Sequence, residues 1–310
     1  MDNPPTRCHL PGMALRSGSA TASFRRSPAR WLPALAILLT GLVAPAGRLP
    51  FAAPRHAVWQ VYAIRYATVP DFPLHWLVAG ADSTRKADIA MTFWLLRDPT
   101  GHCVLVDAGF YREAFLRSWK PVGFVRPTEA LERIGVRPDS VSDLVLTHVH
   151  WDHLDGADLF PNARVWIQRD EYEHYVAEGG VPADEGIDSV HAALLAGLRR
   201  DGRLVFIEGD GREILPGITA YPGGKHTFAS QYLAVRTAKR TVVIASDNIY
   251  LYENLDRRLP IAQTLDAKSN LAAQRRMMRL ASARRLVVPG HDPAVFERFR
   301  RIAPDVVAIE

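Results

Sequence analysis

Short apolar runs separated by polar turns recur along the chain from about residue 58 to its end. Runs of this kind, bounded by turn-forming residues, are typical of buried β-strands. Turns at 98–101 and 237–240 each join two neighbouring runs. We expect strands at residues 92–96, 102–106, 144–146, 164–168, 204–207, 218–221, 232–235, 241–245 and 285–288.

Two stretches are predicted to be helical instead. Residues 170–178 begin with Asp170, whose carboxylate is suited to a helix N-cap. Residues 265–283 contain neither Gly nor Pro. Strands dominate both halves of the chain and helices fall between and after them, so we expect a layered α/β fold with two sheets inside. No linker or repeat follows residue 58, so we expect a single domain.

The charge of the chain is unevenly distributed. The 310 residues are 48% hydrophobic and 23% charged, as in globular proteins, with a net charge of +5. Residues 1–46 hold five arginines and one acid, which leaves about +1 for the remainder. The basic balance therefore belongs to the start of the chain, and a nucleic-acid partner is not expected.

Residues 1–46 have the pattern of a secretory signal peptide. Arginines precede an apolar run at 31–44, and the small residues Ala44-Pro-Ala46 follow it. We expect a leader at 1–46, a functional domain at 47–310 and export to the periplasm or the exterior. The apolar run is shorter than the ~20 residues of a membrane span, although an uncleaved anchor is the alternative. Cleavage would remove Cys8 and leave Cys103 alone, so no disulfide is expected.

The sharpest chemical signal is the segment Thr147-His-Val-His-Trp-Asp-His153, directly after the predicted strand at 144–146. Imidazole and carboxylate groups are the ligands that zinc prefers. His148 and His150 are two residues apart and can point the same way from an extended backbone. Asp152 and His153 lie past a bend and can serve a second ion. This order of residue types predicts a metal site rather than a solvated loop.

Three further candidates follow other predicted strands. His226 comes after a Pro-Gly-Gly-Lys turn, Asp247 lies two residues beyond the run at 241–245, and His291 follows Val-Pro-Gly. In α/β folds, functional groups gather on loops that rigid strands hold in place. Each residue alone would be an ordinary turn or capping residue. As an ordered set, they supply the ligands that the first motif lacks.

This ordered set resembles the metallo-β-lactamase superfamily over about residues 58–299, including the Asp-Ala-Gly turn at 107–109. The resemblance implies a four-layer αβ/βα sandwich with two zinc ions at one edge. It assigns His148, His150 and His226 to one zinc and Asp152, His153 and His291 to the other. Asp247 is the implied bridge between the two ions.

Asp247 and Tyr250 narrow the resemblance to the N-acyl homoserine lactonases, because true zinc β-lactamases lack a carboxylate bridge. The implied reaction is lactone opening by a hydroxide that the two metal ions share. Tyr250 is expected to stabilise the oxyanion, and Asp152 or Asp247 to pass a proton to the ring oxygen. The sequence departs from the lactonase family in the turn at 221–227, which is longer before His226 than in that family.

Other functions share this ligand set. One alternative is a thioesterase of the glyoxalase II type or a phosphodiesterase, and another is a mononuclear iron sulfur dioxygenase. A non-catalytic metal-binding protein is a further alternative. The expected partner is a small-molecule ester or lactone, with no nucleic acid and no stable membrane partner. The sequence makes no prediction of oligomeric state.

The substrate pocket is less clearly indicated. Residues 66–76, rich in aromatics and prolines, precede the first predicted strand and either line an acyl pocket or pack as an N-terminal arm. Residues 178–202 are a second candidate lid. Asp107 either orients a ligand histidine or caps a turn.

Overall fold

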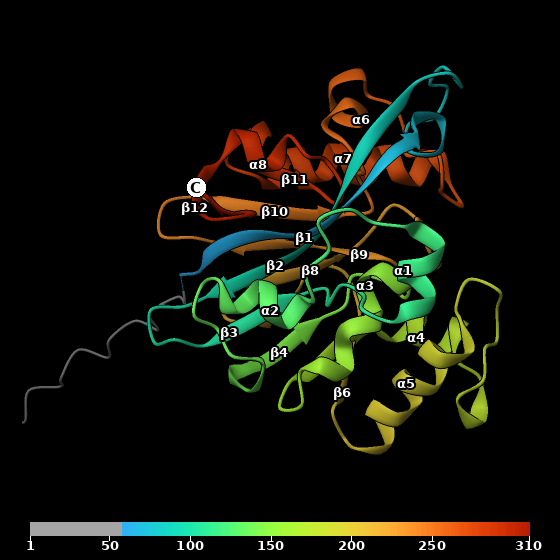
Figure 1. The fold of residues 1–310 in the computed structure, drawn as a ribbon, viewed down its shortest axis with the longest axis vertical. Helices are drawn as coiled ribbons and strands as arrows, with labels where there is room; N and C mark the ends of the chain where they lie inside the picture. The colour runs from blue at the N-terminus through green and yellow to red at the C-terminus, as the bar shows by residue number, and fades with distance from the viewer. Residues whose placement is uncertain (1–57) are drawn as a thin grey trace, which may run out of the picture. The chain divides into compact units, whose positions relative to one another are not determined.

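Two β-sheets pack against each other in residues 58–310, the part of the chain that this computed structural model describes (Figure 1). The larger sheet contains β1 (Gln60–Pro73), β2 (Lys86–Arg97), β3 (Cys103–Val106), β4 (Val141–Val145), β5 (Arg164–Gln168), β6 (Leu204–Ile207), β12 (Arg300–Ala303) and β13 (Val306–Ile309). Their spatial order is β12-β13-β1-β2-β3-β4-β5-β6. The strands from β3 to β6 run parallel, and the others are antiparallel.

The second sheet contains β7 (Arg212–Leu215), β8 (Ile218–Pro222), β9 (Gln231–Arg236), β10 (Thr241–Ser246) and β11 (Val287–Pro289). Their order is β11-β10-β9-β8-β7, with β10 and β11 parallel and the other neighbours antiparallel. The two-sheet α/β architecture expected from the sequence is confirmed.

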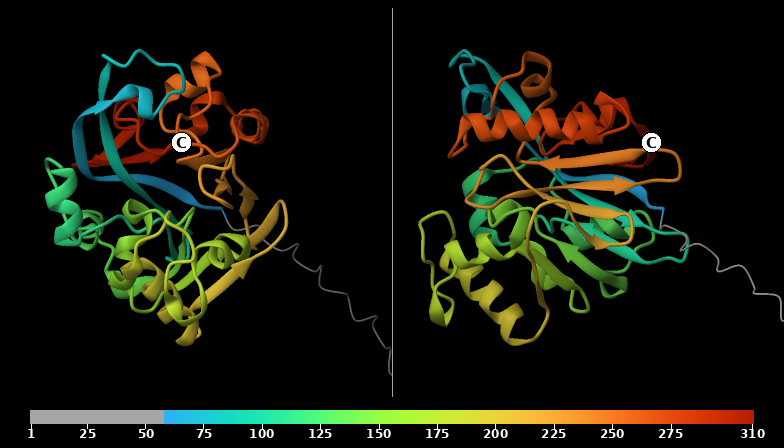
Figure 2. Two further views of the ribbon diagram at one scale, coloured as in Figure 1. Left: turned by 90° about the vertical axis from the view of Figure 1, so that its right-hand side faces the viewer. Right: turned by 180° about the vertical axis from the view of Figure 1, so that it is seen from behind.

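Helices cover the outer sides of both sheets (Figures 1 and 2). On the larger sheet these are α1 (Glu113–Trp119), α2 (Pro127–Glu132), α3 (Trp151–Leu154), α4 (Arg169–Tyr175) and α5 (Ser189–Arg200). On the other side are α6 (Tyr252–Arg257), α7 (Ala267–Leu280) and α8 (Val295–Arg298). Short 3-10 helices are η1 (Leu74–Trp76), η2 (Pro138–Ser140), η3 (Asp155–Leu159), η4 (Glu178–Gly180) and η5 (Arg284–Leu286). Within residues 58–310, no helix is long and apolar enough to cross a bilayer.

Alternate residues of the central strands pack in two separate apolar layers. In β2, Phe93 and Leu95 pack in the layer that α2 and α5 cover. Trp94 and Leu96 face the second sheet and belong to a second apolar cluster, which continues through that sheet to Met277 of α7. Because both faces are covered, β2 is apolar at nearly every position along this stretch. This double burial explains why the sequence shows continuous apolar runs.

The first helix differs from its predicted boundaries. It begins at Arg169 with Gln168 as N-cap, so the prediction of Asp170 as the N-cap was wrong. Asp170 lies in the first turn, where its charge interacts favourably with the positive end of the helix dipole. The helix ends at Tyr175, because Val176 is extended and forms a β-bridge with Pro182.

The later boundaries also differ. The long helix is shorter than 265–283, because the Asp266 carboxylate accepts hydrogen bonds from the Lys268 and Ser269 amides and starts α7 at Ala267. The last predicted strand begins only at Val287, since residues 284–286 form η5. The other predicted strands are present, and the largest difference is in β2, which begins at Lys86 rather than at residue 92.

Four strands were missed, namely β1, β7, β12 and β13. Residues 66–76 do not precede the first core strand, as expected, but form the second half of β1 and then η1. β1 pairs with β2 along most of its length, with bulges between Arg65 and Ala67 and between Val69 and Phe72. The bulges break the period of two on which strand prediction relies. The predicted leader at 1–46 lies outside the described residues, so the leader and its export stay predictions.

Candidate metal centre

The first motif spans the loop after β4 and the start of α3. His150 has an extended backbone (φ −64°, ψ 150°) and is the N-cap of α3, which carries Asp152 and His153. The bend expected between the two pairs is therefore present. His148 and His153 are almost fully buried, so their imidazoles need polar or cationic partners inside the protein.

The remaining candidates lie on loops that follow strands of the second sheet. Asp247 comes directly after β10, where Ser246 turns the chain with a positive φ of 47°. Gly290 follows β11 and precedes His291. A Cβ atom at Gly290 would lie 2.7 Å from Asp247 Oδ1, so a larger residue would displace that carboxylate. His226 lies on the loop after β8.

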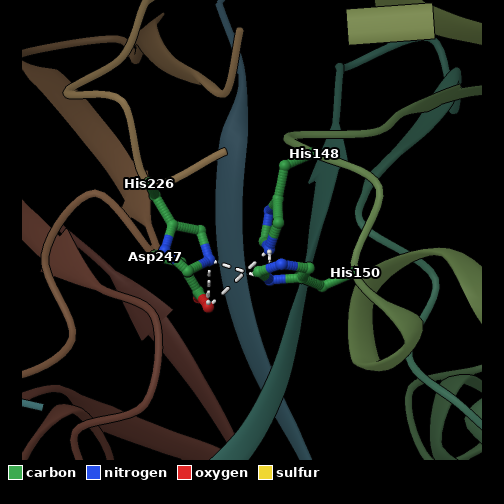
Figure 3. Close-up of side chains that lie close together, drawn as sticks. All are labelled: His148, His150, His226 and Asp247. Atoms are coloured by element: carbon green, nitrogen blue, oxygen red, sulfur yellow. Dashed lines mark hydrogen bonds and ion pairs between the residues drawn. The ribbon is translucent and has the colours of Figure 1, made fainter. Parts of the chain in front are cut away.

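These loops bring all seven predicted ligands together in two clusters that share Asp247. The first cluster consists of His148, His150, His226 and Asp247 (Figure 3). His150 Nδ1 lies 3.1 Å from His148 Nε2 and 2.9 Å from His226 Nε2. Asp247 Oδ2 lies 3.8 Å and 3.4 Å from the same two nitrogens.

The second cluster consists of Asp152, His153, His291 and Asp247. Asp247 Oδ1 lies 3.2 Å from His153 Nε2 and 3.0 Å from His291 Nε2. Asp152 Oδ2 lies 3.3 Å and 3.5 Å from these nitrogens. Each carboxylate oxygen of Asp247 therefore faces a different cluster, which is the geometry of a bridging residue.

The donor atoms fit a divalent cation in each cluster. Tetrahedral zinc with nitrogen and oxygen ligands at about 2.0–2.1 Å would separate those atoms by about 3.4 Å. The distances in both clusters lie around this value. Within residues 58–310, His153 Nε2 and Asp247 Oδ1 are also buried without a hydrogen-bond partner. Unpaired buried polar atoms are costly unless a cation or another group satisfies them.

Four of the five histidines have their Nδ1 atoms hydrogen-bonded away from the clusters. The contacts are His148 with Thr147 Oγ1 (3.0 Å), His153 with Asp107 Oδ2 (2.8 Å), His226 with the Gln263 carbonyl (2.9 Å) and His291 with the Ala90 carbonyl (3.0 Å). A carbonyl or carboxylate accepts the Nδ1 proton, which leaves Nε2 free to bind a metal ion.

The electrostatics of the two clusters differ. Burial lowers the pKa of His148 well below its usual range and that of His150 to about 3, so both are neutral imidazoles. Burial acts the same way on His153, but the carboxylates of Asp152 and Asp247 outweigh it and raise its pKa well above the ordinary value. The second cluster therefore attracts positive charge, and a cation that binds there must displace protons.

Asp107 forms hydrogen bonds with several residues that hold the two clusters in place. Its buried carboxylate accepts hydrogen bonds from the Thr147 amide (2.8 Å), the Thr147 hydroxyl (2.9 Å) and the Ser246 hydroxyl (3.0 Å), besides His153. The geometry thus shows Asp107 as the residue that orients the His153 ring, which was one of the two alternatives. Sequence reasoning missed Thr147 and Ser246, because neighbouring hydroxyls carry no distinctive pattern.

The sequence of the chain matches a known protein family. A model described as the metallo-beta-lactamase superfamily matches residues 92–291. The chain belongs to this superfamily. The expectation of a metallo-β-lactamase sandwich with helices outside two sheets is therefore confirmed, and the two clusters lie on the loops at the edge of that sandwich.

Curated relatives of this chain include N-acyl homoserine lactonases. One from a Bacillus species is 28% identical over 169 residues, which cover 54% of this chain and 62% of the relative. The match thus spans about six tenths of that relative's length. The N-acyl homoserine lactonase AttM of Rhizobium johnstonii is 28% identical over 243 residues, 70% of this chain and 87% of the relative.

Solved structures show the same fold. The structure of B. thuringiensis AiiA with N-decanoyl-L-homoserine bound has a TM-score of 0.65, with 22% identity, and covers 81% of this chain and 99% of AiiA. The dizinc quorum-quenching lactonase AidC has a TM-score of 0.57, with 13% identity, and covers 82% of this chain and 97% of AidC. At these identities, the likeness establishes the fold of the chain.

A cleft of about 390 Å³ opens over Asp152, Asp247 and His291 of the second cluster and over His150 of the first. Tyr250, the predicted oxyanion donor, also lines the cleft, and its side chain is buried. The apolar wall of the cleft consists of Phe72, Trp76, Leu77, Ile89, Met91, Trp119 and Trp151. Residues 66–76 thus contribute Phe72 and Trp76 to the wall, and of residues 178–202 only 185–188 reach the rim. The alternative of a surface arm for 66–76 was wrong.

Glu171 of α4 is a buried residue near the clusters that sequence reasoning missed. Its carboxylate accepts hydrogen bonds from the Val149 amide (3.2 Å), the Ala229 amide (2.6 Å) and the Thr227 hydroxyl (2.5 Å). It therefore joins the loop between His148 and His150 to the loop that follows His226. A glutamate in the first turn of a helix is common, so the sequence gives no signal of this contact.

Burial raises the pKa of Glu171 to about 7, although these hydrogen bonds oppose the shift. The folded protein then holds a proton between about pH 4.5 and 7 that the unfolded chain lacks, so stability falls as pH rises through this range. We expect Glu171 to contribute a loss of about 3 kcal/mol in unfolding free energy across it.

The measurement is urea unfolding of the metal-free protein at several pH values. Wild type should lose stability with pH more steeply than Glu171→Gln, which cannot titrate. Equal slopes for the two proteins would show that Glu171 is ionised throughout and that this account of its burial is incorrect.

Proposed function

We propose that this member of the metallo-β-lactamase superfamily is a metal-dependent hydrolase that opens N-acyl homoserine lactones. The observation that carries the proposal is the shared carboxylate of Asp247 beneath a cleft with an apolar wall. A polar reacting end and an apolar wall match a substrate that joins a lactone ring to an acyl chain. The lactonases among the curated relatives support the same substrate class.

We further propose that each cluster holds one zinc ion. His148, His150 and His226 would hold the first, Asp152, His153 and His291 the second, and Asp247 would contact both. Divalent ions bound there supply Lewis acidity and lower the pKa of a water molecule toward neutrality. The protein supplies the geometry, because hydrogen bonds fix the ring orientations of these histidines before any ion binds.

Tyr250 and Asp152 are the catalytic residues of this proposal, besides Asp247. Burial raises the pKa of Tyr250 well above its usual range, so its hydroxyl keeps its proton and can donate to a lactone carbonyl oxygen. Ring opening also releases an alkoxide that needs a proton. The Asp152 carboxylate lines the cleft, where it would accept a proton from the attacking water and pass it to the ring oxygen as the ring C–O bond breaks.

The charges around the cleft argue against two of the alternatives. Among the described residues that line it, none is Lys or Arg, whereas Glu185 and Asp188 are both acidic. Glutathione thioesters and phosphodiesters are anionic, and these carboxylates would repel them. A neutral lactone meets no such repulsion, and the ring-opened carboxylate product would be repelled and released.

The test combines metal analysis with lactone hydrolysis. We expect about two divalent ions per chain and proton release from short- and long-acyl homoserine lactones. Removal of metal by a chelator should lower kcat/KM by on the order of 10³-fold, and added Zn²⁺ should restore it.

Other outcomes would change the assignment. Two bound metal ions without lactone opening would retain a hydrolase site but remove the proposed substrate. A single iron ion per chain, with oxygen consumption in the presence of a persulfide, would favour the sulfur dioxygenase alternative instead.

A further inference from the structure

Five aromatic rings form a continuous stack that leads away from the cleft. The ring centroids of Phe72 and Trp119 lie 6.1 Å apart, those of Trp119 and Trp151 4.9 Å, and those of Trp151 and Phe115 4.8 Å. The His191 ring completes the stack, 5.5 Å from Phe115. Interplanar angles are 17°, 27°, 13° and 15° in this order. We refer to these five residues as the aromatic stack.

The two ends of the aromatic stack differ in their surroundings. Phe72, Trp119 and Trp151 line the cleft, whereas Phe115 and His191 do not. His191 is fully buried in α5, and its Nε2 lies 2.9 Å from Asp155 Oδ1. The far end of the stack is therefore tied to a buried carboxylate.

Asp155 is itself firmly held. Its Oδ2 accepts hydrogen bonds from the backbone amides of Tyr111 (2.9 Å) and Arg112 (3.0 Å), and the Arg112 guanidinium pairs with its Oδ1 at 2.5 Å. A buried carboxylate with this many donors has one stable position. Asp155 therefore fixes the His191 ring, and the His191 ring in turn gives Phe115 a fixed surface to pack against.

His191 also connects the stack to the rim of the cleft. Its ring Nδ1 lies 3.6 Å from the carboxylate Oδ2 of Asp188, the N-cap of α5 and the last residue of the rim segment 185–188. A movement of the His191 ring would therefore affect the aromatic wall on one side and the rim on the other. Because His191 is fully buried and stacked on Phe115, a displacement of its ring passes along the stack toward the cleft, where there is open space.

We propose that His191, held by Asp155, is a positioning residue that sets the width of the apolar cleft and thereby the acyl-chain length that the enzyme prefers. This inference rests on the proposed lactonase function. His191 contacts neither cluster and does not itself line the cleft, so it acts on the binding of the acyl chain through its neighbours. Short acyl chains contact little of the apolar wall, so their binding depends less on His191.

The test uses two replacements of His191, which separate the role of its ring from that of its contact with Asp155. His191→Phe keeps a ring for Phe115 and loses the contact with Asp155, whereas His191→Gln keeps a donor and loses the ring. Trp119→Leu interrupts the stack from the half-buried helix α1, where a failure to fold is not expected. The matched control is His174→Gln in α4, because His174 stacks on Phe228 (4.0 Å) outside the aromatic stack.

Three quantities are measured on each protein with its metal bound. The first is kcat and KM for N-decanoyl and N-butanoyl homoserine lactone. The second is the affinity for decanamide, which lacks a lactone ring, and the change in tryptophan fluorescence on binding measures it. The third is the exciton couplet in circular dichroism that the stacked indoles of Trp119 and Trp151 produce.

Both His191 variants and Trp119→Leu should raise KM for the decanoyl substrate about tenfold, with a much smaller change for the butanoyl substrate. Decanamide binding should weaken to a similar extent and the couplet should diminish, at unchanged metal content. His174→Gln should match wild type. Retention of the decanoyl preference and of decanamide binding in both His191 variants would overturn the inference.

The two proposals fail differently. If wild type opens neither lactone, the proposed function is wrong, but decanamide binding still tests the aromatic stack. Weaker decanamide binding in the His191 variants would then support the positioning role for another acyl substrate. Equal binding in all proteins would overturn that role as well.

Discussion

Asp247→Asn is expected to lower kcat/KM by on the order of 10³-fold and to reduce the metal content from about two ions per chain to one or fewer. Asp247 Oδ1 faces His153 and His291, and Oδ2 faces the first cluster. An asparagine keeps one of these oxygens and places an NH₂ group where the other was. That group donates hydrogen bonds and repels a cation, so at least one site loses its shared ligand.

Loss of a buried charge can also destabilise a protein without any role in metal binding, and a control must separate the two effects. Asp143 is a buried aspartate of β4, paired with Arg164 and His102 away from the clusters. Asp143→Asn should lower thermal stability and keep full metal content. If Asp247→Asn retained both metal ions and wild-type kcat/KM, a bridging role for Asp247 would be excluded.

Tyr250→Phe is expected to lower kcat by about 10²-fold with little change in KM or metal content. The Tyr250 hydroxyl lies 3.3 Å from His226 Nδ1 and 3.4 Å from Gln263 Oε1, both long contacts. Such weak partners leave it available to a carbonyl oxygen that gains charge in the transition state. A donor that acts mainly in the transition state affects kcat rather than ground-state binding.

The neighbouring tyrosine provides the matched control for this prediction. Tyr252 is similarly buried, but its hydroxyl contacts the Arg285 carbonyl (3.4 Å) and does not line the cleft. Tyr252→Phe should therefore leave kcat at the wild-type value. Equal kcat for Tyr250→Phe and wild type would remove Tyr250 from the catalytic residues and leave it a packed aromatic residue.

Much of the fold could be predicted from local patterns. Continuous apolar runs such as 92–96 identify strands buried on both faces, because a covered sheet needs apolar residues on each side. The exceptions include β1, whose bulges break the periodicity, the short strands β7, β12 and β13, and the helix α5, none of which was predicted. The start of α4 at Arg169 also depends on the chain that packs around it. Boundaries of this kind are set by tertiary contacts rather than by single residues.

The candidate ligands were also accessible from the sequence, since residue type and position after a strand are local properties. His148, Asp247 and His291 each follow a short apolar run that is a strand in the structure. The supporting contacts were not accessible. Glu171 and the Gln263 carbonyl reach the clusters from segments distant in sequence, and nothing in their local pattern distinguishes them from ordinary surface residues.

By itself, the sequence determined the two-sheet architecture and the ordered set of seven histidines and aspartates, because apolar periodicity and side-chain chemistry are written residue by residue. Only the tertiary structure decided that Asp247 turns one oxygen to each cluster and that Asp107 orients His153. It also decided that a stack of aromatic rings leads from the cleft to His191. These features depend on distances between side chains that lie far apart along the chain, and such distances are fixed only when the sheets and helices pack together.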